Sequence, residues 1–194
     1  MSAEFAQPGP VGKVFRNLRR IGLRGMLIFV LVVALFSGRD PEKIGDNFQI
    51  ALPILALGCA VADGSAVRLV GRYVLLEFFI KTPKSTLGMH PINVRPNGGD
   101  RGFPSGHTAV AVFGTTALVQ SCLKNSPAAQ AVAIITGGFV GASRIEADKH
   151  YIWQVLAGAI LGLLVQTLTL TAYDRFVARI WKIISGPFRS GAKK

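Results

Sequence analysis

The chain has 194 residues, half of which are hydrophobic, and carries a formal net charge of +12. Its mean hydropathy of +0.42 is high for a soluble domain, so the composition favours a membrane protein. The positive charge is compatible with a nucleic acid, an anionic substrate or an anionic membrane surface. Because the sequence contains no recognition helix and no basic face with stacking aromatic residues, we expect no nucleic-acid partner.

Basic residues gather at the two ends of the chain, the arrangement typical of cytoplasmic termini in membrane proteins. This predicts basic cytoplasmic tails at residues 1–20 and 174–194, on either side of a membrane domain at 21–173. We expect the second tail to bind anionic lipids of the inner leaflet. The basic residues are Lys13, Arg16, Arg19, Arg20 and Arg24, and then Arg175, Arg179, Lys182, Arg189, Lys193 and Lys194.

Apolar runs along the chain predict an all-α fold, an integral membrane bundle of six transmembrane helices. We expect an uncleaved first helix, because no small-residue cleavage pattern of a signal peptide follows it. A polar connector at 38–47 and a long polar loop from Lys81 to Phe103 separate some of the helices. The expected helices lie at 21–37, 48–62, 65–80, 105–123, 128–143 and 151–172.

Two cysteines and three charged residues fall within the apolar runs. Cys59 and Cys122 are interpreted as small buried residues and not as a disulfide or a metal pair. Arg68, Arg72 and Glu77 interrupt the third run. We expect these three side chains to reach toward the interface or to pair with one another.

The predicted topology places the polar segments together. Six spans agree with two cytoplasmic ends, and counting the crossings puts three segments on the extracytoplasmic side. These are the loop from Lys81 to Phe103, the start of the helix at 105 and the turn at 143–150. An active site built from them faces away from the cytoplasm.

Three polar clusters in those segments describe an anion site. They are VRP at 94–96, FPSGHT at 103–108 and SRIEADKHYIWQV at 143–155. Ser105 and Gly106 begin an apolar helix whose unpaired backbone amides attract an anion, and Gly106 leaves space for its close approach. Arg95 and Arg144 supply guanidinium groups that match phosphate oxygens. Donors without a carboxylate cage predict an oxyanion site and no metal.

Two histidines complete the chemistry expected at such a site. A neutral imidazole can attack phosphorus, while a protonated imidazole donates to the leaving oxygen. His107 and His150 are available for these two roles. Gln154 lies four residues after His150, shares its helical face and can accept the imidazole N–H, which fixes the tautomer.

The three clusters resemble the signature of the type 2 phosphatidic acid phosphatase superfamily. That signature has a Lys before Arg-Pro, then Pro-Ser-Gly-His, then Ser-Arg, five residues, His, three residues and Asp. The resemblance implies that His150 becomes phosphorylated, that His107 protonates the leaving group and later activates water, and that no metal or other cofactor is required. The phosphate-binding residues it implies are Lys84, Arg95, Ser105, Gly106 and Arg144.

Two positions depart from the signature. Gly88 stands where the Lys is usual, so the phosphate-binding lysine is expected further upstream on the loop, with Lys84 favoured over Lys81. Gln154 stands where Asp is common, and a neutral amide cannot stabilise an imidazolium by charge. We therefore expect weaker support of the nucleophile, although members resembling glucose-6-phosphatase and dolichyl diphosphatase also carry His-x-x-x-Gln.

The resemblance implies a membrane enzyme that removes phosphate from a lipid phosphomonoester or diphosphate, in a bacterial inner membrane. Lipid A 1-phosphate, undecaprenyl diphosphate, phosphatidylglycerol phosphate and phosphatidate all fit as substrates. One alternative is a phosphotransferase that passes the phosphate to another lipid. Another is a non-catalytic binder or transporter of lipid phosphates, in which Gln154 and the missing lysine mark lost chemistry. The sequence does not indicate an oligomeric state.

Overall fold

The computed structural model describes residues 21–168 and 171–190, and all regular secondary structure within these ranges is helical. The predicted all-α fold is therefore confirmed. The basic residues before position 21 and after position 190 lie outside the described residues, and the predictions for them stay predictions. The elements are α2 (Leu23–Ser37), α3 (Pro41–Ala62), α4 (Ala66–Thr86), the 3₁₀ turn η1 (Pro91–Asn93), α5 (Gly106–Gln120), α6 (Pro127–Glu146), α7 (Ile152–Thr167) and α8 (Thr171–Ser190).

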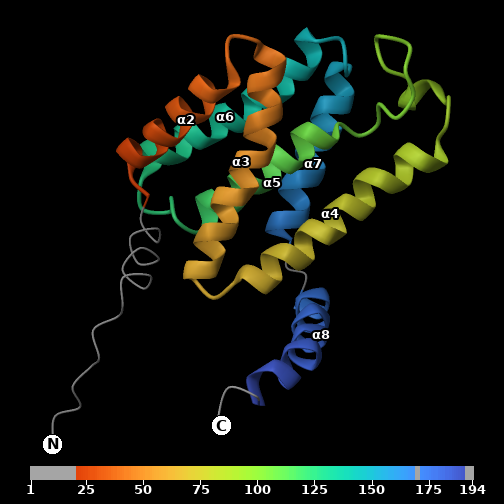
Figure 1. Cartoon of the computed structure of the whole chain (residues 1–194). Coiled ribbons are helices and arrows are strands. Elements are labelled where there is room, and N and C mark those ends of the chain that lie inside the picture. Colours follow the sequence, from red (N-terminus) through yellow and green to blue (C-terminus); the bar gives the residue numbers. More distant parts are fainter. Residues whose placement is uncertain (1–20, 169–170, 191–194) are drawn as a thin grey trace, which may run out of the picture.

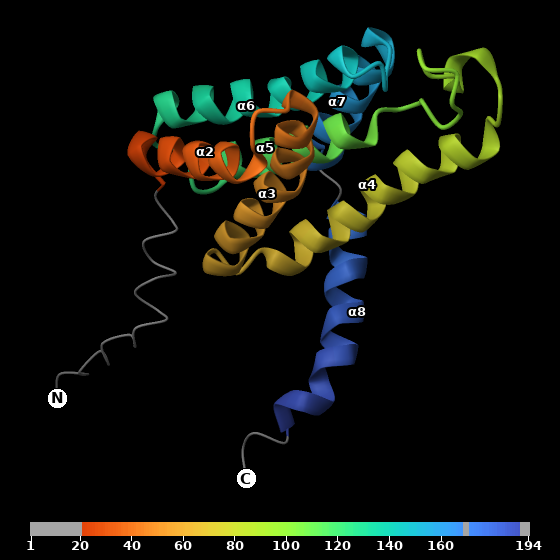
Figure 2. The ribbon, with the colours of Figure 1, turned by 45° about the horizontal axis from the view of Figure 1, so that its top comes forward.

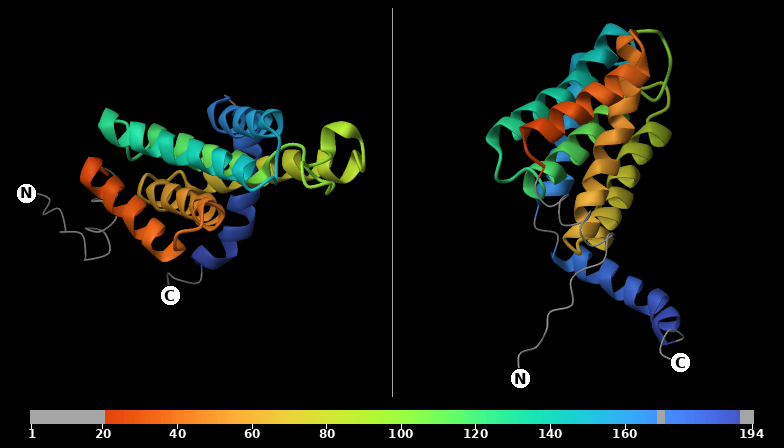
Figure 3. Two further views of the ribbon diagram at one scale, coloured as in Figure 1. Left: turned by 90° about the horizontal axis from the view of Figure 1, so that it is seen from above. Right: turned by 60° about the vertical axis from the view of Figure 1, so that its left-hand side comes forward.

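The central element of the bundle is α5. It packs against α3, α4, α6 and α7, and its buried side chains include Phe113 and Leu118. Figure 1 shows these helices around α5, with α2 beside α6 at the outer edge. α4 packs against both α3 and α7, and α8 contacts α4 and projects beyond the bundle (Figure 2). The two views in Figure 3 show that the α4–α5 loop also extends from the bundle.

Two glycines let α7 lie directly against α5. A Cβ atom on Gly158 would lie 2.4 Å from the carbonyl oxygen of Ser105, and one on Gly162 would lie 2.2 Å from that of Ala109. The two glycines are four residues apart on one helical face, the spacing that allows close helix approach in membranes. This contact fixes the start of α5 next to the start of α7, so two of the polar clusters are held together.

Two helices are longer than the sequence predicts. α3 begins at Pro41, inside the predicted connector, because the carboxylate of Asp40 accepts the backbone N–H of Glu42 at 2.9 Å and proline suits the first helical turn. α4 continues to Thr86 instead of ending near residue 80. The expectation that the candidate lysines Lys81 and Lys84 lie on a loop was therefore wrong, since both are part of the last turns of α4.

The helices indicate association with a membrane. α3 and α6 are long and apolar enough to cross a bilayer, and α7 with α8, which are bent by 68°, make a third span if they act as one. α2 is apolar, but its 15 residues cover about 22 Å of a hydrocarbon core of about 30 Å. Large apolar side chains are exposed along α2, α3, α6 and α7. Six spans stay a prediction.

The interpretation of the cysteines was half wrong. Cys59 and Cys122 are both buried, as predicted, but they form a disulfide that joins the end of α3 to the residues after α5. Their Cα atoms lie 5.9 Å apart, within the usual range for such a bond. The two apolar runs, considered separately, gave no indication that α3 and α5 pack side by side and bring these residues together.

Candidate functional site

The three polar clusters meet in one cavity of about 320 Å³. Figure 1 shows that the α2–α3 turn, the α4–α5 loop and the α6–α7 turn lie at the same end of the bundle. The structure therefore brings together the predicted residues Lys84, Arg95, His107, Arg144 and His150. The full lining is Glu42, Asp46, Lys84, Arg95, His107, Arg144, Lys149 and His150.

Gln154 holds the ring of His150 in one orientation. Nδ1 of His150 lies 3.1 Å from Oε1 of Gln154, while the Gln154 side-chain nitrogen donates to two backbone carbonyls, of Ile92 at 3.1 Å and Val94 at 2.8 Å. These two bonds require the amide nitrogen to face the carbonyls, so the amide oxygen faces the ring. Because that oxygen only accepts, Nδ1 carries the proton and Nε2 keeps its lone pair.

The surroundings of His150 favour a neutral ring. The residue lies in the turn between α6 and α7 and is 3% exposed. Burial lowers the pKa of His150 to about 4, an effect that the hydrogen bond to Gln154 opposes and the cations Lys84 and Arg95 reinforce. A neutral imidazole with a free Nε2 is the form that attacks phosphorus.

Gln154 also makes contacts that an aspartate at this position could not make. Gln154 is fully buried, and its amide nitrogen ties α7 to the loop that carries Arg95. A carboxylate has no proton to offer these two carbonyl oxygens. The departure from the usual signature therefore has a structural role that an aspartate cannot fill.

Arg95 and Lys84 converge on a single backbone oxygen. Nη2 of Arg95 donates to the carbonyl of Arg101 at 3.1 Å, and Nζ of Lys84 donates to the same oxygen at 3.0 Å. Among the described residues, the buried Nε of Arg95 has no hydrogen-bond partner. Two like charges beside a donor that lacks a partner are stabilised when an anion binds between them.

Of the two candidate lysines, Lys84 lines the cavity. Lys81 points away, its side chain is 75% exposed, and its ammonium pairs with Glu77 at 3.1 Å. Gly106 lies close to Lys84, since a Cβ atom there would be 3.3 Å from Ile80 and 3.9 Å from the Lys84 Nζ. A side chain at position 106 would therefore crowd the space beside the lysine.

The start of α5 differs in part from the prediction. Ser105 precedes the helix and is fully buried, but its backbone N–H donates to the carbonyl of Gln154 at 3.0 Å and its hydroxyl pairs with that of Thr108 at 2.9 Å. Its amide is thus not one of the unpaired donors that we expected. The backbone of Gly106 and His107 forms the first turn of α5 at the cavity.

Sequence reasoning missed two carboxylates in the cavity, those of Glu42 and Asp46 on α3. Oδ1 of Asp46 lies 3.1 Å from Nε2 of His107 and 2.8 Å from Nη1 of Arg144. Glu42 lies 3.4 Å from the ammonium of Lys149, and its backbone oxygen accepts from Arg144 at 2.7 Å. The Asp40-Pro41 pair, a typical helix start, was the sequence signal that should have placed both residues on a helix.

Gly45, the residue before Asp46, permits the close contact between α3 and α6. A Cβ atom on Gly45 would lie 2.1 Å from the hydroxyl oxygen of Ser143, so α3 reaches α6 only because the side chain is missing. The cavity thus contains two carboxylates, Glu42 and Asp46, beside the predicted donors. Within the described ranges, no group of three or more His, Cys, Asp or Glu side chains is arranged to hold a metal ion.

A family model described as the PAP2 superfamily matches residues 72–178, more than half of the chain. The chain therefore belongs to this superfamily, whose members are phosphatases that act on phosphate esters. The matched region contains the predicted site residues from Lys84 to Gln154 but not Glu42 and Asp46. No curated protein and no solved structure matches the chain.

Proposed function

We propose that the protein is a membrane lipid phosphatase, which hydrolyses a phosphomonoester or diphosphate of a lipid at the extracytoplasmic face through a phosphohistidine. The observation that carries this proposal is the buried, neutral His150, which shares one cavity with Lys84, Arg95 and Arg144. The exposed apolar surface of the surrounding helices supports a substrate with a lipid tail, because a lipid can enter from the bilayer beside the cavity.

In the first step, Nε2 of His150 attacks the phosphorus atom and forms an N–P bond. The bond from phosphorus to the lipid oxygen breaks, and this oxygen takes a proton from His107. Charge on the transferring phosphoryl group is stabilised by Lys84, Arg95 and Arg144. The guanidinium Nε of Arg95, which lacks a partner in the described structure, gains one from the phosphate.

In the second step, a water molecule loses a proton to His107 and attacks the phosphohistidine. The N–P bond breaks, inorganic phosphate leaves, and His150 regains its neutral ring with the proton still on Nδ1. Asp46 acts on His107 in both steps. Its carboxylate, 3.1 Å from Nε2, pairs with the imidazolium that donates its proton in the first step and forms again in the second.

The test is to trap the phosphoenzyme. The full chain is purified in detergent and mixed briefly with a lipid phosphate carrying ³²P in its phosphoryl group, with EDTA present. We expect a labelled protein that is stable in base and labile in acid, as phosphohistidine is, and steady release of phosphate. His150→Ala should lose the label and reduce release on the order of 10³-fold or more.

Two other results would overturn parts of the proposal. Label transferred to a second lipid instead of water would identify a phosphotransferase. Lipid binding without label in either protein would identify a non-catalytic binder. Lys81→Gln is a suitable control because this exposed lysine lies outside the cavity.

A further inference from the structure

A second polar cavity lies at the end of the bundle opposite to the catalytic cavity. It has a volume of about 350 Å³ and opens between the last turns of α3, α5 and α7 and the first turn of α4. Arg68 lines this cavity and Lys84 lines the catalytic one. These residues are 16 positions apart on α4, or roughly 24 Å, so the two cavities are separate.

The charged side chains that line this cavity are mostly positive. Its charged lining consists of Arg68, Arg72 and Lys124 against Asp63. Arg72 pairs with Asp174, through two contacts of 3.1 and 2.8 Å, and Glu77 pairs with Lys81, so the pairing of these residues with one another, one of the two arrangements expected from the sequence, is not found in the described structure.

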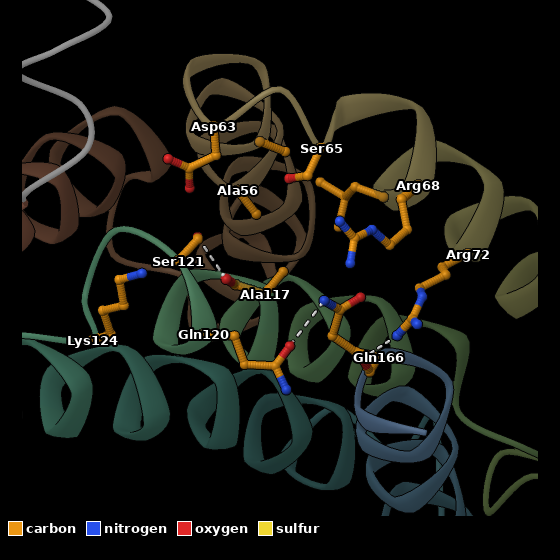
Figure 4. Close-up of a pocket in the computed structure, with 12 residues that line it drawn as sticks. Ala56, Asp63, Ser65, Arg68, Arg72, Ala117, Gln120, Ser121, Lys124 and Gln166 are labelled. Carbon is orange, nitrogen blue, oxygen red and sulfur yellow. Dashed lines mark hydrogen bonds between the residues drawn. The ribbon is translucent and has the colours of Figure 1, made fainter. Parts of the chain in front are cut away.

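Arg68 and Lys124 are both exposed, and within the described residues neither makes a hydrogen bond or an ion pair. Figure 4 shows Arg68 entering the cavity from α4 and Lys124 from the connection between α5 and α6. A guanidinium and an ammonium group without partners that share one small cavity favour an anion. Hydroxyl groups of Ser65 and Ser121 lie in the same lining and offer additional polar contacts.

The walls of the cavity are held by two cross-links between helices. The Cys59–Cys122 disulfide joins α3 to the chain just after Ser121. The Arg72 contacts to Asp174 and to the carbonyl of Gln166 join α4 to α7 and α8. Polar groups held in place by the fold lose less entropy when a ligand binds.

An apolar groove adjoins the cavity and points to a lipid. Leu69 lines both, and the groove, of about 250 Å³, runs between α3, α4 and α5. Its other walls include Ile54, Val70 and Tyr73, and the first two are 62% and 47% exposed. A free anion would use only the polar cavity, whereas a lipid uses the polar cavity for its headgroup and the groove for an acyl chain.

The surroundings of the cavity agree with a membrane interface. α8 is joined to α4 beside the cavity, where the Tyr173 hydroxyl donates to the carbonyl of Gly71 at 2.6 Å. This helix exposes apolar side chains such as Phe176 and Trp181 as well as the cations Arg175 and Arg179. In the predicted topology this is the cytoplasmic end, where anionic lipids meet basic side chains.

We propose that this cavity is a second lipid site, which binds the phosphate of an anionic glycerophospholipid between Arg68 and Lys124 while an acyl chain lies in the groove beside Leu69. The site needs only the membrane location and is independent of the proposed hydrolysis. Its ligand is bound and not consumed, because no histidine or other nucleophile of the phosphatase chemistry lines the cavity.

The test measures lipid binding to the full chain in detergent by native mass spectrometry, with phosphatidylglycerol, phosphatidylcholine and inorganic phosphate as separate probes. Arg68→Gln combined with Lys124→Gln removes the two cations. The matched control, Arg39→Gln combined with Lys81→Gln, removes the same charge from exposed positions at the other end of the bundle, outside the lining of either cavity. Both double variants should keep the phosphatase activity of the wild type.

We expect phosphatidylglycerol to bind the wild type and the control equally and the cavity variant at least about tenfold more weakly. Equal affinity in all three proteins would overturn the proposal, as would cavity-dependent binding of phosphatidylcholine at the same affinity. Cavity-dependent binding of inorganic phosphate without the lipid would overturn the lipid assignment. If the double variant fails to fold, Lys124→Gln alone is used, because this residue lies on an exposed turn.

Discussion

The two histidines of the proposed catalytic cavity are supported by different partners. Nδ1 of buried His150 meets the neutral amide of Gln154 at 3.1 Å, whereas Nε2 of partly exposed His107 meets the carboxylate of Asp46 at the same distance. An amide fixes a tautomer without favouring a charged ring, as a nucleophile requires. A carboxylate pairs with an imidazolium, as a general acid requires. The partners therefore support the two roles proposed for these histidines, and they are an observation independent of the sequence motifs.

Of the partners of the two histidines, Gln154 is the one whose replacement should reduce kcat/KM most. Gln154→Asp restores the common residue of the signature, but it removes the donors to the carbonyls of Ile92 and Val94. Each of these partly buried carbonyls, left without its partner, costs on the order of 1 kcal/mol. We expect kcat/KM to fall about a hundredfold.

The comparison variant for this prediction is Gln154→Glu, which keeps the length of the side chain. It should also lose activity, because the missing donors and not the reach of the side chain are responsible. Phosphate release from a lipid phosphate measures both variants. An increase in activity for Gln154→Asp would show that the usual charged support is better here, and would contradict our account of Gln154.

The sequence predicted the support of His150 by Gln154 but missed the support of His107 by Asp46. His150, Gln154 and the arginines lie in short motifs whose spacing can be read directly, and counting the predicted spans brought the motifs together. Asp46 lies 61 positions before His107 and outside any motif. Its contact depends on α3 beginning at Pro41 and on Gly45 allowing α3 to touch α6. The disulfide was missed for a similar reason, since it depends on packing between helices.

The distance between the two histidines depends on the close contact of α5 with α7 at Gly158. Gly158→Ala places a methyl group against the carbonyl of Ser105, which would be 2.4 Å away, so α5 and α7 must separate. Because Ser105 leads to His107 and α7 follows His150, we expect at least a tenfold loss of kcat and a destabilisation of about 1–3 kcal/mol. Thermal unfolding in detergent and phosphate release measure the two effects.

Gly138→Ala is the matched control for this change. Position 138 is also in a helix, but a Cβ atom there has nothing within 4 Å. Alanine favours the helix over glycine by up to about 1 kcal/mol, so this variant should be as stable as the wild type or more so. Equal behaviour of the two variants would show that the close contact at Gly158 does not position the site.

Asp46→Asn tests the charged partner of His107 and should have a smaller effect. The amide oxygen can still accept from the histidine, but it carries no charge to pair with the imidazolium. We expect kcat to fall about tenfold at neutral pH, and the alkaline limb of the pH–rate profile to move to lower pH. Glu42→Gln removes a carboxylate from the same cavity without a contact to His107, so it should leave this limb in place. A profile unchanged by Asp46→Asn would remove Asp46 from the acid–base chemistry.

The smallest expected effect is the position of the acid limb in the pH–rate profile of the wild type. This limb reports the protonation of His150. Only the neutral ring attacks phosphorus, so protonation of His150 lowers activity as the pH falls. Since burial lowers the pKa of His150 to about 4, kcat/KM should stay constant through the range near pH 6.5, where an ordinary histidine titrates, and fall only below about pH 5. The rates must be corrected for the ionisation of the substrate itself. An acid limb near pH 6.5 after that correction would mean that His150 is not held in a neutral, buried form, and the contrast with His107 would lose its basis.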